Sequence, residues 1–239
     1  MVHEVILARS ELKKSKEARY LAHFKDVALS AGLNTSILVA GSEDKRLAGA
    51  NRNAGWDLAT AEYVAFLDAD DKYSSKRFSI LNSIIDRFCP DAIVHSFAFD
   101  EVDIAIHATE EVILESLVSS EDLREATFPD GKRQIDSEIL GPGSSNLLLP
   151  SAFAELGIHH AHITVKTSLR NELLFRTDFP RREDGLFCRD LLFEGKDIVF
   201  TSLKLSRWVT ARSTAKSSKV LNLLNVIGLF KRLYLLFHR

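Results

Sequence analysis

The stretch AGANRNAGWDLATAEYVAFLDADD, residues 48–71, carries the pattern on which the predicted fold depends. Small residues dominate its first half and predict a helix over 48–61. The run from Tyr63 to Leu67 is apolar throughout and stops abruptly at aspartates, which is typical of a central parallel strand buried on both faces. Ligands of open α/β sheets bind beyond the carboxyl ends of the strands, so these aspartates stand where a ligand site is expected.

On either side of this stretch, strand patterns alternate with helix patterns. Strands are predicted at 5–8, 37–39, 92–99, 162–165 and 198–200, and helices at 21–31, at 75–88 with Ser75 as cap, and at 185–194 ending at Gly195. The alternation predicts an α/β fold with a mostly parallel central sheet and helices on both faces. We assign residues 1–215 to one such domain and residues 216–239 to a C-terminal amphipathic basic helix.

Composition and charge restrict the classes of function. The formal net charge of -2 gives no reason to expect nucleic acid as a partner. The chain has two cysteines, too few for a disulfide framework, so a reducing compartment is expected. The apolar run near the N-terminus is too short for a signal peptide, and no apolar run is long enough to span a bilayer. We therefore expect a cytoplasmic protein.

Asp68 and Asp70 form the strongest chemical signal. They are two residues apart, so in extended chain their carboxylates point the same way. Such hard oxygen donors suit Mg²⁺ or Mn²⁺ shared with a diphosphate. The other reading is a solvated turn, because aspartate is common in turns. The third carboxylate, Asp71, favours a cation, since the three negative charges repel one another.

Residues 48–71 resemble the core of family 2 glycosyltransferases of the GT-A fold. In that family an Ala-Arg-Asn-x-Gly helix start precedes small residues, Gly-Glu-Tyr, an apolar strand and Asp-Ala-Asp-Asp. Here the residues from Arg52 to Gly55, and Glu62 with Tyr63, follow that order and spacing. The resemblance implies an enzyme that moves a sugar from a nucleotide-sugar donor to a glycan or lipid-linked acceptor with Mn²⁺ or Mg²⁺, in cell-surface or envelope glycan synthesis.

The same resemblance implies a role for each matching residue. Asp70 would bind the metal, Asp68 would contact the donor ribose or assist the metal, and Arg52 would contact the nucleotide. For Arg52 the other reading is a salt bridge on the helix face. Ala8, at the end of the first strand, lies where members of the family contact the donor, although the family's Pro-Thr-Tyr-Asn is absent. Arg212 lies where members carry a basic loop that closes on the diphosphate; the other reading is a solvated loop.

Residues 181–200, RREDGLFCRDLLFEGKDIVF, carry a second resemblance: Glu-Asp, an aromatic residue, then a helix ending in glycine. It implies that Asp184 is the catalytic base of an inverting enzyme, which takes the proton of the attacking hydroxyl. The other reading is that Glu183 and Asp184 only favour a helix N-terminus. We expect His162 to line the acceptor site or to pack, in preference to binding zinc.

The sequence departs from the family where the nucleotide base would be recognised. Members usually end the second strand with Asp-Asp-Gly-Ser, whereas here the strand ends Val-Ala-Gly-Ser at Ser42. Glu43 or Asp44 could substitute from the loop. The departure keeps open an inactive nucleotide- or glycan-binding module of the same fold. A phosphotransferase with Asp68 as nucleophile is a weaker third reading, because the strand comes late and Lys72 follows.

The C-terminal segment KVLNLLNVIGLFKRLYLLFHR, Lys219–Arg239, has a helical apolar stripe with basic residues near its end. Such a helix suits the surface of an anionic membrane and predicts peripheral attachment to its inner face. It cannot span the bilayer, because Lys231 and Arg232 interrupt the apolar run. The alternative is that the helix packs on its own domain or forms a dimer seam.

Overall fold

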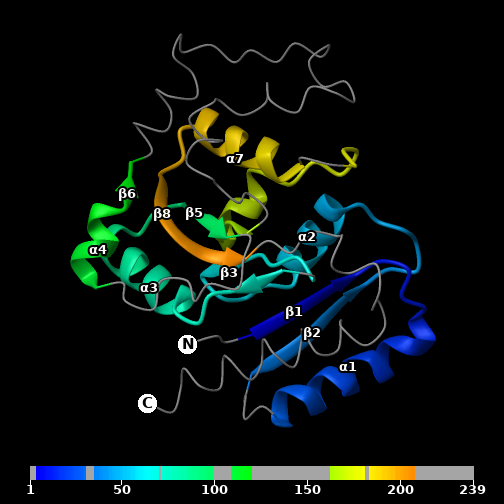
Figure 1. Ribbon diagram of the computed structural model, residues 1–239. Helices are drawn as coiled ribbons and strands as arrows, with labels where there is room; N and C mark the ends of the chain where they lie inside the picture. The colour runs from blue at the N-terminus through cyan, green and yellow to red at the C-terminus, as the bar shows by residue number, and fades with distance from the viewer. Residues whose placement is uncertain are drawn as a thin grey trace.

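A computed structural model describes residues 4–30, 35–69, 71–98, 109–119, 162–180 and 183–207. Two strands form a separate parallel pair: β1 (Glu4–Arg9) and β2 (Ser36–Gly41), joined by helix α1 (Lys14–Ser30). Phe24 and Ala28 of α1 pack on Ile37 of β2. This unit appears in blue at one end of the described structure (Figure 1). The strands and the helix predicted here are confirmed.

Within the described residues, the main sheet has six strands. Their order is β3 (Tyr63–Ala65), β7 (Thr164–Lys166), β5 (Ala92–Ala98), β8 (Ile198–Arg207) and β4 (Lys72–Tyr73), with β6 (Leu117–Val118) also paired to β8. Its β5–β8 pair is parallel, and its other described pairs are antiparallel. The α/β class is confirmed, but the sheet is mixed rather than mostly parallel. Antiparallel neighbours need no helical crossover, so short strands can join the sheet from loops.

Strand β3 differs most from its prediction. It is three residues long, lies at one end of the strand order and runs antiparallel to β7. Its residues are only half-buried. Phe66, just after the strand, is 8% exposed and lies in the core, which explains why the apolar run is longer than the strand. Its N–H still bonds Ile163 O at 3.1 Å.

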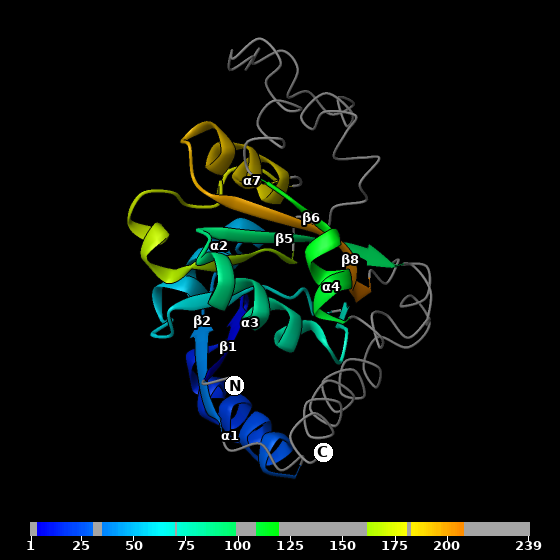
Figure 2. The same cartoon turned by 90° about the vertical axis from the view of Figure 1, so that its left-hand side faces the viewer.

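The faces of the sheet are covered by different helices. Successive residues of a strand point to opposite faces. Ala92 and Val94 of β5 pack in the cluster that contains residues of α2 (Ala48–Asp57) and α7 (Glu183–Phe193). Ile93 packs instead with α3 (Arg77–Phe88) and α4 (Glu110–Glu115). Figure 2, turned by 90°, shows α7 on one side of β5 and β8 and α3 on the other. Helices on both faces are therefore confirmed.

Two helix boundaries differ from prediction for local reasons. α2 stops at Asp57 rather than 61, and Glu4 Oε1 accepts the N–H groups of Thr60 and Ala61 at 2.7 and 2.9 Å, which fixes a turn there. The cap position of α3 is Lys76, without a side-chain cap bond, rather than Ser75. The end of α7 agrees with prediction, because Gly195 follows it with φ at +73°.

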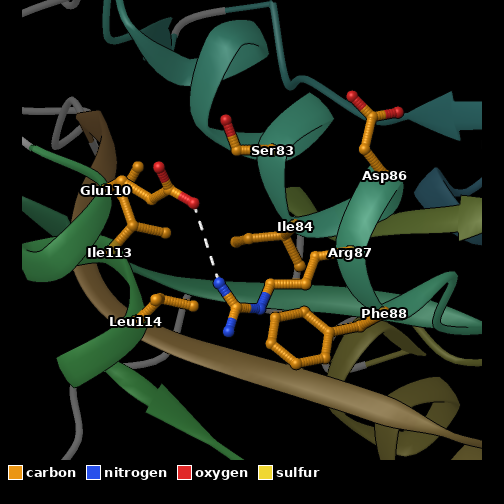
Figure 3. A pocket seen from close by; sticks show the side chains of 8 residues that line it. All are labelled: Ser83, Ile84, Asp86, Arg87, Phe88, Glu110, Ile113 and Leu114. Carbon is orange, nitrogen blue, oxygen red and sulfur yellow. Dashed lines mark ion pairs between the residues drawn. The ribbon is translucent and has the colours of Figure 1, made fainter.

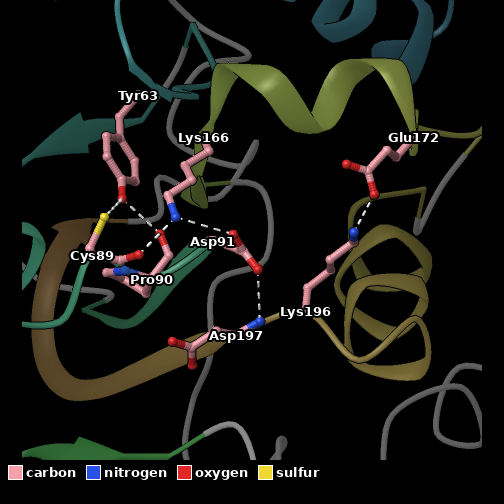
Figure 4. A network of polar contacts seen from close by, with 8 residues as sticks. All are labelled: Tyr63, Cys89, Pro90, Asp91, Lys166, Glu172, Lys196 and Asp197. Atoms are coloured by element: carbon pink, nitrogen blue, oxygen red, sulfur yellow. Dashed lines mark hydrogen bonds and ion pairs between the residues drawn. The ribbon is translucent and has the colours of Figure 1, made fainter.

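A polar network fixes the amino ends of β3, β5 and β8 (Figure 4). Asp91, just before β5, bonds Lys166 Nζ through Oδ1 at 3.3 Å and accepts the N–H of Asp197 through Oδ2 at 3.0 Å. Tyr63 Oη donates to Pro90 O at 2.8 Å. This edge is opposite to the one where Asp68 follows β3.

Over the described ranges, no helix combines the length and apolar character required to traverse a bilayer. The predicted helix 216–239 and the domain boundary before it lie outside the described residues.

Candidate functional site

Arg52 of α2 joins the two acidic motifs. Its Nη2 bonds Asp68 Oδ1, beyond the end of β3, at 3.0 Å, and its Nη1 bonds Glu183 Oε1 at the start of α7. The side chains of Arg52 and Glu183 are 9% and 5% exposed, whereas that of Asp68 is 42% exposed. One buried guanidinium therefore holds two carboxylates that are far apart in sequence, and one of the two faces solvent.

One face of α2 brings Arg52 to this position. Gly49, Arg52, Asn53 and Trp56 are buried and share that face, as residues three, four and seven apart do. The Asn53 amide donates to Phe175 O at 2.8 Å, and its Oδ1 accepts the Phe175 N–H at 3.0 Å. This two-way bond attaches α2 to the segment that precedes α7.

Aromatic side chains form the floor beneath the guanidinium. The Arg52 guanidinium lies 5.4 Å from the centre of the Phe175 ring, within range of a cation–π contact. Phe175 stacks on Phe187 of α7 with ring centres 4.1 Å apart. Trp56 meets Phe66, Phe175 and Phe187 edge-on. The floor packs α2 and α7 against each other beside the polar groups.

The electrostatic balance of the site is negative. Burial lowers the pKa of Arg52, but Asp68, Asp184 and Glu183 outweigh burial and raise it, so the guanidinium stays charged. The pKa of the Cys188 thiol is raised well above its ordinary value, first by burial and then by Asp184. Among the described groups that act on Arg52, three carboxylates against this one guanidinium leave a formal charge of about -2, which favours a cation.

The structure brings three of the predicted residues together. Arg52 bonds Asp68, and Asp184 lies near enough for its charge to raise the pKa of Arg52. Asp184 lies in the first turn of α7, and its Oδ1 accepts the Gly185 N–H at 2.9 Å. Asp70 and Arg212 lie outside the described residues. For each of these residues, the role in donor binding, metal binding or catalysis stays a prediction.

Ala8 lies exposed at the carboxyl end of β1. Its methyl group is 3.6 Å from where a Cβ on Gly55 of α2 would be. It therefore stands at the contact between β1 and α2, and its role as a donor contact also stays a prediction.

The groups present fit a divalent cation in part. Asp68 offers a hard carboxylate oxygen on a half-exposed side chain, in a negative environment. Within the residues that the structure describes, no cluster of three or more acidic, histidine or cysteine side chains forms a complete metal site. Asp70 is outside that set, and the metal stays a prediction.

Two pairs were missed by the sequence reasoning. Glu183 was expected only to favour a helix start, and it is the buried partner of Arg52. Asp71 Oδ2 pairs with His162 Nε2 at 3.0 Å, with both side chains buried. No local pattern signals either pair, because the partners meet only in the folded chain. For His162, the expectation of packing agrees with its burial.

Glu43 is engaged elsewhere than expected. Its Oε1 accepts the Lys14 N–H at 2.9 Å, at the first residue of α1. In this arrangement Glu43 satisfies a helix N-terminus. Both predicted substitutes for the base-reading aspartate, Glu43 and Asp44, are exposed.

A groove of about 460 Å³ lies away from these residues, between α3 and α4 (Figure 3). Arg87 crosses it toward Glu110, with Nη1 3.7 Å from Oε1, and Ile84 and Ile113 supply apolar walls. None of the predicted site residues that the structure describes lines it. It belongs to the face of the sheet opposite α7.

Known proteins match both the sequence and the fold. Residues 15–129 match the model of glycosyl transferase family 2. The amylovoran biosynthesis glycosyltransferase AmsB of Erwinia amylovora is 38% identical over 74 residues, which are 31% of this chain and 24% of AmsB. The crystal structure of S. aureus TarS with UDP has a TM-score of 0.50 at 14% identity, covering 95% of this chain and 54% of that one.

The fold and the acidic motifs define the class as GT-A. The chain is similar to glycosyl transferase family 2 over residues 15–129, which are 115 of its 239 residues. The matching stretch covers about a quarter of the length of AmsB and about half of the TarS chain.

Proposed function

We propose that this protein transfers a sugar from a nucleotide-sugar donor to an acceptor hydroxyl with inversion, in the synthesis of a cell-surface or envelope glycan. One observation carries the proposal: the buried Arg52 bonds both Asp68 and Glu183, which places Asp184, the neighbour of Glu183, on the same side of the fold as Asp68. The match to the glycosyl transferase family 2 model and the similarity to AmsB, an amylovoran biosynthesis glycosyltransferase, support sugar transfer and polysaccharide synthesis.

The chemistry requires a base and a donor-binding carboxylate on one site. Asp184 accepts the proton of the acceptor hydroxyl while that oxygen forms a bond to the anomeric carbon. The bond from this carbon to the diphosphate breaks, and its electron pair stays on the diphosphate oxygen. Asp68 and Asp70 would hold the donor ribose and the metal. Bound Mn²⁺ or Mg²⁺ would supply positive charge beside the diphosphate.

The first donor to test is a uridine diphosphate sugar. TarS, which shares the fold, was crystallised with UDP. We extend this ligand to the present chain as a proposal, together with a glycan or lipid-linked acceptor. A cytoplasmic location at the inner face of the membrane fits such an acceptor and the basic, amphipathic segment Lys219–Arg239.

A thermal-shift screen of nucleoside diphosphates with and without Mn²⁺ tests the proposal. A ligand at about 100 times its Kd stabilises the folded state by about 2.7 kcal/mol, which corresponds to about 5–10 °C in a chain of this length. We expect a metal-dependent shift with UDP, followed by hydrolysis or transfer of UDP-GlcNAc. The absence of any shift with every nucleotide tested would contradict the proposal.

An inactive binding module of the same fold is the second candidate. It is favoured by the end of β2, where no acid precedes Gly41 and Glu43 is bonded to the start of α1. A metal-dependent thermal shift without hydrolysis or transfer of any sugar donor would support this module over the enzyme.

A further inference from the structure

We propose that Glu183 is a positioning residue for transfer. By bonding Arg52, it fixes the first turn of α7, so that Asp184 keeps a set position relative to Asp68. This inference rests on the proposed function, because Asp184 is the base in that function. It assigns to Glu183 a role beyond the helix N-terminus that the sequence suggests.

Burial distinguishes the two partners of Arg52. Asp68 is half-exposed and can turn toward a ligand or a cation, whereas Glu183 is buried with Arg52. A buried charge that loses its partner is strongly unfavourable. Glu183 therefore keeps Arg52 paired whenever Asp68 engages the donor side of the site.

The surroundings restrain both members of the pair. Gly49, one turn before Arg52, approaches so closely that a Cβ there would lie 2.1 Å from Arg176 O and 3.2 Å from Glu183 Cγ. The Phe175 ring beneath Arg52 stacks on Phe187, one turn beyond Glu183 on α7. The pair is thus held by packing as well as by charge.

Removing the charge of Glu183 has a specific consequence for Asp184. Arg52 already interacts with Asp184 through its charge. Without the Glu183 carboxylate, the guanidinium would be drawn toward Asp184 and would engage the base. A base that is displaced or paired in this way accepts the acceptor proton less well. The expected effect is on turnover rather than on donor affinity.

The test uses Glu183→Gln with Asp190→Asn as the matched control, both in a Cys89→Ser background. Asp190 is also an acidic residue of α7 paired with an arginine, since its Oδ2 lies 3.0 Å from Arg176 Nη2. Cys188, buried one turn after Asp184, is then the only thiol and reports on the opening of this helix.

For Glu183→Gln we expect turnover of UDP-GlcNAc to fall about 10- to 100-fold, as for a displaced catalytic group, with an unchanged Kd for UDP with Mn²⁺. Alkylation of Cys188 should become faster. Asp190→Asn should lower the melting temperature yet keep the parental turnover. Should Glu183→Gln fail to fold, Glu183→Asp replaces it, with a smaller loss of turnover because the charge is kept.

Three results would overturn the role of Glu183 while leaving the proposed function intact. These are parental turnover in the Glu183 variant, a loss of UDP affinity as large as the loss of turnover, and an equal loss of turnover in Asp190→Asn. If the parent chain binds no nucleotide and turns over no donor, the proposed function fails and the role of Glu183 fails with it.

Discussion

Gly49→Ala should destabilise the protein, because the added methyl group would clash at a close contact that only glycine permits. Gly49 lies in the first turn of α2, where the helix meets the backbone of Arg176. A Cβ at this position would lie 2.1 Å from Arg176 O, whereas real Cβ atoms essentially never approach a neighbour within 3.0 Å. The helix and the segment before α7 must separate by about 0.9 Å, the difference between these distances.

The separation acts on the bonds next to it. The two bonds between Asn53 and the backbone of Phe175, at 2.8 and 3.0 Å, would stretch beyond hydrogen-bond range. Together they contribute about 1–3 kcal/mol, and the remaining crowding costs about 1 kcal/mol more. We expect a loss of about 2–4 kcal/mol, which lowers the melting temperature by about 5–15 °C.

Gly55→Ala is the matched control on the same helix. The nearest atom to a Cβ on Gly55 is 3.6 Å away, at Ala8, which is an ordinary contact. Alanine is favoured over glycine inside a helix by about 0.5–1 kcal/mol, so this variant should melt at or slightly above the parent. Scanning calorimetry of parent and both variants decides the matter. If Gly49→Ala melts as high as Gly55→Ala, the reasoning about the close approach is wrong.

The remaining predictions concern the base, the metal and the membrane. Asp184→Asn should bind UDP with Mn²⁺ as the parent does but turn over about 10²–10⁴-fold more slowly, since an amide accepts no proton; turnover within about twofold of parent removes Asp184 as the base. Asp70→Ala should abolish Mn²⁺-dependent UDP binding in calorimetric titration without loss of the fold, and equal affinity would exclude Asp70. In co-sedimentation with anionic liposomes at low salt, the full chain should pellet and a chain ending at Ser218 should not; both remaining in the supernatant contradicts the membrane tail.

Local patterns were sufficient for most elements of the fold. The apolar residues of α1, and the apolar runs at 92–99 and 198–200, each correspond to an observed helix or strand. The direction of pairing was not predictable from such runs. The same apolar run is expected for two different structures. One is a strand buried by helices on both faces, and the other is a short strand that continues into the core through Phe66. For that reason β3 was placed in the centre of a parallel sheet and lies instead at its end.

The site was predictable in its members but not in its connections. The resemblance pointed to Asp68 and Arg52, and the structure adds that they are bonded to each other. The sequence left open a salt bridge for Arg52 on its helix face, which would involve a neighbour three or four residues away. The observed second partner, Glu183, is on another helix, and no periodicity relates residues so distant.

Gly49 and Gly55 show why the connections of the site could be seen only in the folded structure. In sequence they are equivalent: both lie within the predicted helix, and a glycine there indicates either tolerated cost or close approach of another segment. In the fold, Gly49 faces the Arg176 carbonyl and the stem of Glu183, while Gly55 faces the methyl group of Ala8 at ordinary distance. Only the first of them lets α2 approach α7 closely enough for Arg52 to reach Glu183. The spacing between the predicted base and the predicted donor-binding carboxylate therefore depends on a residue that has no side chain and no chemistry of its own.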